Sequence, residues 1–255
     1  MLFLTVYGPE LESLFYYIHK HTQQGESISR DQLYSAYLPQ TALAHKGQTK
    51  NIEDAVNYLK VARLIGGDKA YFCVQPNVDM DLPFATLLLH QFRQLEHIST
   101  QLPLLDLLYI TLLEQLYIAP NRVWVSDVHA AANQLGLAQQ TGGISQEKIG
   151  AWKRVMEFLG LGFRMGSGFY CLYRPELLHA IALRWPLTEG SLQEFFEDYL
   201  KSWVPCLTAR GEVAQPVAYT LEHLAQKGSI HLHSKQDSPS RPYFGTLHLR
   251  GIKVV

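Results

Sequence analysis

Apolar residues recur every three or four positions in several separate stretches of the chain, a spacing typical of amphipathic helices. In residues 145–159 they gather on one helical face and leave the opposite face polar. The apolar face consists of Ile149, Trp152, Val155, Met156 and Leu159. Short β-prone segments beside glycine-rich turns predict small hairpins. The whole pattern predicts a mainly helical α+β fold with small β-hairpins.

The same order of elements is expected twice along the chain, which indicates an internal repeat. Each copy contains a helix, a short β-prone segment, further helical sequence, and a glycine-rich turn that leads into a strand. The main helices and the final strand of the first copy are expected at residues 10–21, 51–63 and 70–74. Those of the second copy are expected at residues 104–116, 145–159 and 169–173.

The spacing of landmark residues supports this repeat. Ser29 precedes Leu64 by 35 positions, and Ser126 precedes Leu161 by the same 35. One extra residue in the second glycine-rich turn then aligns Cys73 with Cys171. We expect both cysteines to be buried as small apolar side chains at equivalent strand positions.

Polar residues at the expected helix starts are suited to N-capping. Ser29 and Ser126 follow short β-prone segments, and we expect them to cap the second helix of each copy. Asn51 and Ser145 are expected to cap the third helix of each copy.

A third, shorter copy is expected at the C-terminal end. Ser191 and Glu194 form a capping-box pattern ahead of an amphipathic helix. One further helix and two strands around a polar loop follow, at residues 216–228, 229–233 and 245–249. Residues 207–229 have room for only one helix, so a helix of the full unit is expected to be missing or reduced.

These expectations divide the chain into four parts. They are a first unit at residues 1–78, a connecting helix within 79–103, a second unit at 104–186 and a shortened third unit at 187–255. The connecting helix carries a leucine-rich stripe. We favour packing of this stripe inside the protein over its use as a subunit interface.

Helix, short strand, helix, helix and β-hairpin, in this order, resembles the winged helix-turn-helix fold. The resemblance covers residues 9–76 and 104–175 well and residues 191–255 in part. It implies tandem winged-helix units joined by helices. Winged helices bind DNA through the third helix and the wing. They also serve as protein adaptors and dimerisation modules, so the fold alone does not decide the function.

The overall charge excludes a chain that binds nucleic acid along its whole length, because 22 lysines and arginines face 23 aspartates and glutamates. Local clusters are different. Between residues 148 and 174, five basic residues face one acidic residue, and residues 227–255 have the same balance. Each cluster suits a phosphate backbone, and each also fits an ordinary solvated surface.

The second unit and the C-terminal wing are therefore predicted to bind double-stranded DNA. The residues predicted to contact it are Lys148, Lys153, Arg154 and Arg164 in the second unit, and Lys235, Arg241 and Arg250 near the C-terminus. The alternative is a winged-helix adaptor that binds protein, such as a subunit of a DNA-processing, defence or chromosome-organising complex. A continuous basic stripe on the surface favours DNA, whereas scattered charge favours the adaptor.

Sequence signatures of catalysis are absent. The chain contains no GxSxG, HExxH, GxxxxGKS/T or GxGxxG motif, so we expect neither an enzyme nor a bound cofactor. His231, His233 and His248 could ligate a metal across the last hairpin, but no cysteine or carboxylate completes the set nearby, so we expect no metal. The three cysteines form no CxxC pair, and no long apolar segment or signal peptide is visible. A cytoplasmic protein without membrane contact is expected.

Overall fold

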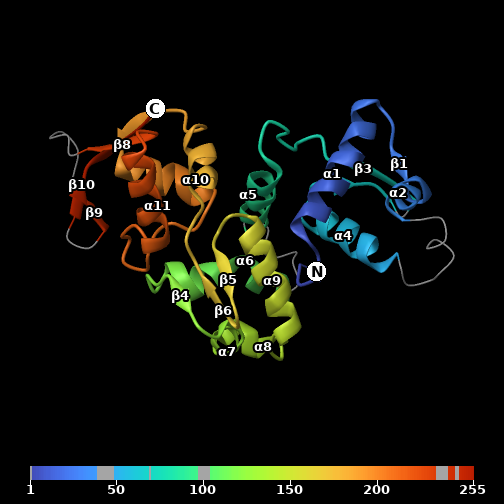
Figure 1. The fold of residues 1–255 in the computed structure, drawn as a ribbon, viewed down its shortest axis with the longest axis horizontal. Helices are drawn as coiled ribbons and strands as arrows, with labels where there is room; N and C mark the ends of the chain where they lie inside the picture. Colours follow the sequence, from blue (N-terminus) through green and yellow to red (C-terminus); the bar gives the residue numbers. More distant parts are fainter. Residues whose placement is uncertain (1, 39–48, 69, 97–103, 234–240, 245–246) are drawn as a thin grey trace.

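The helices and short strands form three successive groups, with helix α5 lying between the first group and the other two (Figure 1). The structure is a computed structural model that describes residues 2–38, 49–68, 70–96, 104–233, 241–244 and 247–255. The first group lies at one side of the molecule, the third at the other side, and the second between them (Figure 1).

The elements follow one another in a repeated order. The first group contains α1 Gly8–Gln23, β1 Ile28–Ser29, α2 Arg30–Tyr37, α4 Lys50–Val61, β2 Ile65–Gly66 and β3 Tyr71–Val74, and the connecting helix α5 spans Phe84–Glu96. The second contains α6 Leu104–Leu113, its π-helical continuation η2 Glu114–Ile118, β4 Trp124–Val125, α7 Val128–Asn133, α8 Gly136–Gln140, α9 Gln146–Phe158, β5 Phe163–Met165 and β6 Gly168–Tyr170. The third contains α10 Pro175–Ala182, β7 Glu189–Ser191, the π and 3-10 segments η3 Glu194–Tyr199 and η4 Leu200–Ser202, α11 Gln215–Gln226, β8 Ile230–His233, β9 Arg241–Phe244, β10 Leu247–Leu249 and β11 Gly251–Val254.

Each group has a small antiparallel sheet of three strands, which confirms the predicted α+β character. The strand orders are β1-β3-β2, β4-β6-β5 and β7-β11-β8, so the last strand of each group is central. Strands β9 and β10 form a separate two-stranded sheet between β8 and β11 in the chain.

The strand pairing of the first two sheets has the same register. The equivalent pairs are Ile28–Phe72 with Val125–Phe169, and Gly66–Cys73 with Phe163–Tyr170. The counterpart of Cys73 is therefore Tyr170, and the predicted alignment of Cys73 with Cys171 was wrong. That alignment matched the two residues by type alone. They lie on different faces of their strands, since Cys171 is buried whereas Cys73 is partly exposed.

The last helix of each group, α4, α9 or α11, which we call its third helix, ends in the same left-handed turn. The backbone φ is 57° at Arg63, 80° at Gly160 and 75° at Gly228. In each turn the next amide donates to the carbonyl five residues earlier, from Leu64 to Leu59, from Leu161 to Met156 and from Ser229 to Leu224. The three groups thus share this turn and the central position of their last strand.

Two of the predicted N-caps are confirmed. Ser29 forms a capping box with Gln32 at the start of α2. The hydroxyl of Ser145 accepts the amide of Lys148 at the start of α9. These two caps fix where the second helix of the first group and the third helix of the second group begin.

The other two predicted N-caps were wrong. Asp127 caps α7 in place of Ser126 by accepting the amide of Ala130. The carbonyl of Ser126 instead accepts the hydroxyl of Ser167 in the β5–β6 turn. Asn51 lies inside α4, because this helix begins one residue before it.

The helical stripes predicted from the sequence form the core. Ile149, Trp152, Met156 and Leu159 are buried, and the indole N–H of Trp152 donates to the carbonyl of Tyr109 at 3.2 Å. Helix α5 contacts α1, α6 and α10, so its predicted packing inside the protein is confirmed. Among the described residues, none of the helices has the length and apolar character needed to span a membrane.

The third group departs from its expected form. The capping box of Ser191 and Glu194 is confirmed, but π and 3-10 turns follow it where a regular helix was expected. No helix is missing, because α10 precedes β7 as α1 precedes β1. The partner of β8 is β11 rather than residues 245–249, since Ile252 and Val254 of β11 supply the buried face.

Candidate interaction surfaces

A cavity of about 490 Å³ lies along α9, on the side where DNA contact was predicted. Its walls come from the first turns of α7 and α9 and from the turn between β5 and β6. The lining residues are Asp127, His129, Gln146, Ile149, Gly150, Lys153, Gly166 and Ser167. We call this cavity the α9 groove.

Lys153 binds the protein itself in this groove. The side chain is buried, and its ammonium donates to the carbonyls of Gly166, Ser167 and Gly168 at 3.1, 2.9 and 3.4 Å. Burial, followed by the nearby charge of Arg164, lowers the pKa of Lys153. All its donors are directed at the β5–β6 turn, so the structure does not present Lys153 as a free cation, and its contact with DNA stays a prediction.

Two of the neighbouring cations, Arg154 and Arg164, are also engaged within the chain. The guanidinium of Arg154 lies 5.5 Å from the ring centre of Tyr7, and the residue is partly buried. Arg164 donates from Nε to Glu157 at 2.6 Å. Lys148 is partly buried in the first turn of α9. The structure does not gather these four predicted contacts into one free basic surface.

An N-terminal arm, residues 2–7, covers another side of α9. The amide of Leu2 donates to the buried carboxylate of Asp106 at 2.6 Å, and Phe3 packs edge-on against Tyr109. The hydroxyl of Thr5 lies 3.5 Å from the carboxylate of Glu147 on α9. The arm thereby joins the first group to the second.

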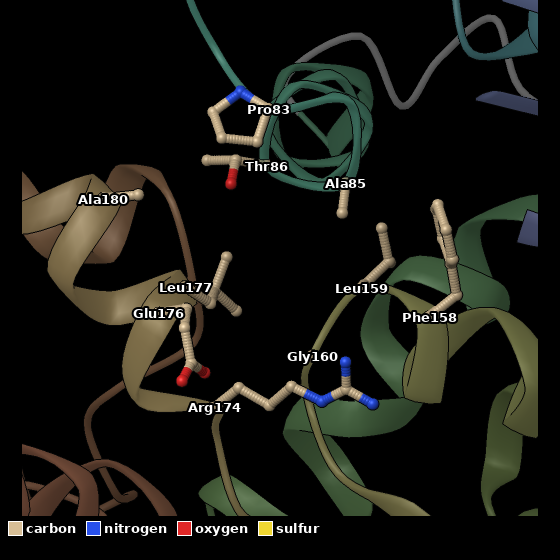
Figure 2. Close-up of a pocket in the computed structure, with 10 residues that line it drawn as sticks. All are labelled: Pro83, Ala85, Thr86, Phe158, Leu159, Gly160, Arg174, Glu176, Leu177 and Ala180. Carbon is tan, nitrogen blue, oxygen red and sulfur yellow. The ribbon is translucent and has the colours of Figure 1, made fainter. Parts of the chain in front are cut away.

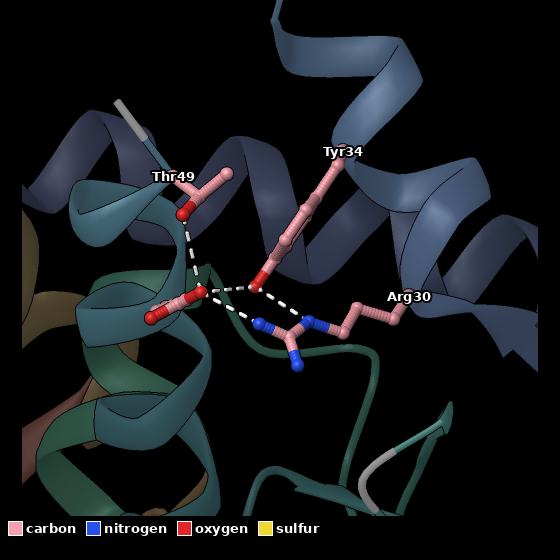
Figure 3. Close-up of polar contacts among 4 residues, drawn as sticks. Arg30, Tyr34 and Thr49 are labelled. Atoms are coloured by element: carbon pink, nitrogen blue, oxygen red, sulfur yellow. Dashed lines mark hydrogen bonds and ion pairs between the residues drawn. The ribbon is translucent and has the colours of Figure 1, made fainter. Parts of the chain in front are cut away.

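The third helix of the first group is engaged by charged and polar side chains. Figure 3 shows Arg30, Tyr34 and Thr49 directed at one carboxylate, which belongs to Glu53 of α4. Arg30 donates to Glu53 at 2.6 Å, and the Tyr34 hydroxyl donates at 3.2 Å. Further along α4, the ammonium of Lys60 donates to the carbonyl of Asp68 in the β2–β3 turn at 2.7 Å.

In the third group, the β9–β10 hairpin covers α11. Tyr243 of β9 is fully buried, and its hydroxyl donates to the carbonyl of Ala218 at 3.3 Å. Burial raises the pKa of Tyr243 well above its ordinary value. The hairpin that was predicted as a DNA-binding wing therefore packs against α11, the helix expected to enter the DNA groove beside that wing.

The predicted contacts near the C-terminus are only partly described. Lys235 lies outside the described residues, and Arg241 is described as the first residue of β9 by its backbone alone. Arg250 is partly buried, and its amide donates to the carbonyl of His233 at 3.1 Å. Nothing in the described residues brings this cluster together with that on α9.

Three aromatic side chains of the second sheet, two of them exposed, form a surface that the sequence did not reveal. Trp124, Tyr170 and Phe163 are direct cross-strand neighbours on β4, β6 and β5. The rings of Phe163 and Tyr170 stack with centres 5.0 Å apart, and Trp124 lies 6.3 Å from Tyr170. We call these three residues the aromatic row. The aromatic residues of these strands are visible in the sequence, but the sequence does not show which face of the sheet is exposed to solvent.

A smaller cleft of about 280 Å³ lies where α5, the end of α9 and α10 meet (Figure 2). Its walls are mainly apolar, and Arg174 and Glu176 are its charged residues. The stem of Arg174 passes over Gly160, where a β-carbon would lie 3.4 Å from it. The cleft thus marks the junction of the connecting helix with the second and third groups.

Two of the buried phenols pair with each other. The hydroxyls of Tyr58 and Tyr109 lie 2.7 Å apart, and burial raises the pKa of both well above the ordinary value. Burial also raises the pKa of the Cys206 thiol to about 12. Within the described ranges, no three His, Cys, Asp or Glu side chains lie close enough to hold a metal ion.

Comparison with protein-family models, curated proteins and solved structures found no match. The surfaces are therefore interpreted from their own geometry.

Proposed function

We propose that the chain is a non-catalytic adaptor of three winged-helix units that binds a protein partner. The units correspond to residues 8–74, 104–170 and 175–254, so α10 belongs to the third unit in this proposal. The repeated order of elements and the central position of each last strand support this division. The sequence resemblance to the winged helix-turn-helix fold agrees with it.

The observation that carries the proposal is the state of the three third helices. In a winged helix that reads duplex DNA, this helix enters the major groove and presents free side chains to the bases. Here Glu53 of α4 is bound by Arg30, Lys153 of α9 is bound by its own turn, and Ala218 of α11 is covered by Tyr243. Intramolecular contacts on all three helices favour partner binding at other surfaces.

Titration of a labelled duplex tests the proposal against the predicted DNA binding. We expect no saturable binding between about 50 and 200 mM salt, the range over which phosphate contacts show a steep salt dependence. Saturable binding that weakens in a Lys148→Ala, Arg250→Ala variant would overturn the adaptor proposal. The matched control is a Lys20→Ala, Lys201→Ala variant, which removes two exposed cations elsewhere.

Site-specific photo-crosslinking in living cells tests partner binding directly. A photoreactive phenylalanine is placed in turn at Tyr16, Tyr71, Trp124 and Tyr219, which are exposed aromatic positions on all three units. We expect a protein adduct of fixed size at some of these positions and none at the others. Absence of a position-specific adduct at all four rejects the adaptor.

A further inference from the structure

The aromatic row occurs on one unit only. The corresponding cross-strand residues of the third sheet are Glu189, Lys253 and His231, and Lys253 forms an ion pair with Glu189 at 3.5 Å. In the first sheet the corresponding pair is Gly66 with Cys73. The same position in one repeated fold is thus charged or small in two units and aromatic in the second.

Much of the aromatic row is exposed to solvent. Trp124 and Phe163 are 39% and 41% exposed, and the adjoining Met165 is 54% exposed. Gly168 lies beneath the Trp124 ring, since a β-carbon there would overlap it. Tryptophan, tyrosine, phenylalanine and methionine are the residue types enriched at protein interfaces, whereas lysine and glutamate are depleted there. This composition singles the row out as an interface.

Strand addition does not explain the row. The sheet has two edge strands, β4 and β5, and the amide of Arg164 in β5 donates to Glu157 at 3.1 Å. A partner strand needs free backbone groups along such an edge. The Glu157 side chain holds this amide, which disfavours strand addition at β5, and the exposed rings of Trp124 and Phe163 offer the open face of the sheet to a partner instead.

The size of the row argues against a second copy of the chain. Three strands at the usual spacing span about 10 Å across the row. A stable dimer buries about 800 Å² on each partner, which is far more than this face offers. The row therefore fits a short linear segment.

Ring geometry and hydrogen-bonding capacity indicate the chemistry of that segment. Trp124 and Tyr170 are inclined by 37°, which leaves a wedge between two aromatic faces, and each ring carries one polar hydrogen that can donate a hydrogen bond. Proline-rich segments in the polyproline II conformation dock on such aromatic surfaces, and their carbonyls are free to accept hydrogen bonds. A phosphate backbone fits less well, because Arg164 beside the row is already paired with Glu157.

We propose that the aromatic row of the second unit binds a proline-rich segment of a protein partner. This inference rests on the adaptor function proposed above and names its docking surface. The wedge between Trp124 and Tyr170 receives a proline ring, and the stacked Phe163 holds Tyr170 in place.

Binding of the intact chain to an array of synthetic peptides tests this inference. The array contains twelve-residue peptides with a PxxP core and varied flanking residues, together with the same peptides with every proline replaced by alanine. We expect micromolar binding to a subset of the proline peptides, and a loss of about tenfold or more with Trp124→Ala, as for an interface hot spot. Tyr219→Ala is the matched control, because Tyr219 is 41% exposed on α11, close to the 39% of Trp124.

Two further measurements separate folding from binding. Circular dichroism checks that Trp124→Ala is folded, and Phe163→Ser serves as a second variant of the row.

Binding to no proline peptide, or an equal loss of peptide affinity with Tyr219→Ala, overturns the inference. Binding of single-stranded oligothymidylate that Trp124→Ala abolishes also overturns it and assigns the row to nucleic acid. If crosslinks form at Tyr16, Tyr71 or Tyr219 while the peptides fail, the adaptor function stands and only this docking surface is rejected.

Discussion

Arg63 adopts a left-handed backbone conformation that its two counterparts achieve with glycine. Its φ is 57°, and its exposed side chain adds no packing in return. A left-handed conformation costs a non-glycine residue roughly 1–2 kcal/mol. Glycine avoids this strain, but its greater backbone freedom in the unfolded chain offsets part of the gain in stability. We expect Arg63→Gly to raise the free energy of unfolding by about 0.5–1 kcal/mol.

Urea denaturation checks this expectation. The control is Gly228→Ala at the equivalent position, which has open space around it but keeps a positive φ. It should lower the free energy of unfolding by about 1 kcal/mol. If Arg63→Gly has no effect or destabilises the protein, the turn is not strained as described.

The pair Tyr58 and Tyr109 allows a double-mutant cycle. Each hydroxyl is the buried hydrogen-bond partner of the other. Replacing one tyrosine by phenylalanine leaves the other hydroxyl without this partner and should cost about 1–3 kcal/mol. Replacing both should cost less than the sum of the two single changes. Additive losses in denaturant unfolding would show that the two hydroxyls are not coupled.

Single residues show where sequence reasoning reaches its limit. The burial of Ile149 and Trp152 followed from helical periodicity alone. Lys153 lies at the flank of the same helix, but its partners are carbonyls of a turn that begins 13 positions later. Helical periodicity carries no information about such contacts, so on its own it predicts a free cation at Lys153.

At the scale of elements, side chains of the third helices bind the first hairpin strands or the turns after them. Glu157 of α9 accepts the amide of Arg164 in β5, seven residues later, and Lys60 of α4 approaches the carbonyl of Gly67 at the same separation. Charged side chains on an edge strand prevent pairing with another chain. The β5 edge is therefore protected by a side chain of its own unit, whereas Lys60 holds the turn that follows β2.

Removing one of these side chains should promote self-association. Glu157→Ala frees the amide of Arg164 on an edge strand whose three residues are all exposed. We expect a small loss of stability, below about 1 kcal/mol for an exposed pair, and concentration-dependent association in sedimentation velocity. Glu157→Gln keeps the acceptor and should remain monodisperse to the same extent as the original chain. Equal behaviour of the two variants would contradict this role.

Elements with long-range partners were the hardest to predict. Helices α9 and α11 and the first two hairpins followed from local patterns. The pairing of β8 with β11 did not, because the β9–β10 hairpin separates them in the chain and is itself β-prone. The aromatic row was missed for a related reason, since three strands must be assembled before their shared face exists.

At the scale of the whole molecule, many buried phenols and thiols make stability sensitive to alkaline pH. Burial raises the pKa of Tyr58, Tyr109, Tyr117 and Tyr173, whose ordinary value is 10.0, and also that of Cys171. The unfolded chain loses these protons first, so their contribution is complete below the ordinary pKa and is lost as pH rises above it. The lowered pKa of Lys153 acts in the opposite direction, but it is one group against several.

We therefore expect the free energy of unfolding to fall steeply between about pH 9.5 and 11.5. Denaturant titrations at stepped pH measure this slope. The Tyr58→Phe, Tyr109→Phe variant should show a shallower decline, because two of the buried phenols are gone. An unchanged slope would mean that these phenols ionise as freely in the folded protein as in the unfolded chain.

The N-terminal arm has a consequence for how the protein is made. Leu2 is synthesised 104 residues before Asp106, its binding partner. At about 5–20 residues per second, the ribosome takes about 5–20 s to deliver that partner. During this interval Leu2, Phe3 and Val6, all buried in the finished protein, have no surface of the second group to cover them. The first group thus emerges as an incomplete intermediate, and its earliest residues are among the last to reach their final place.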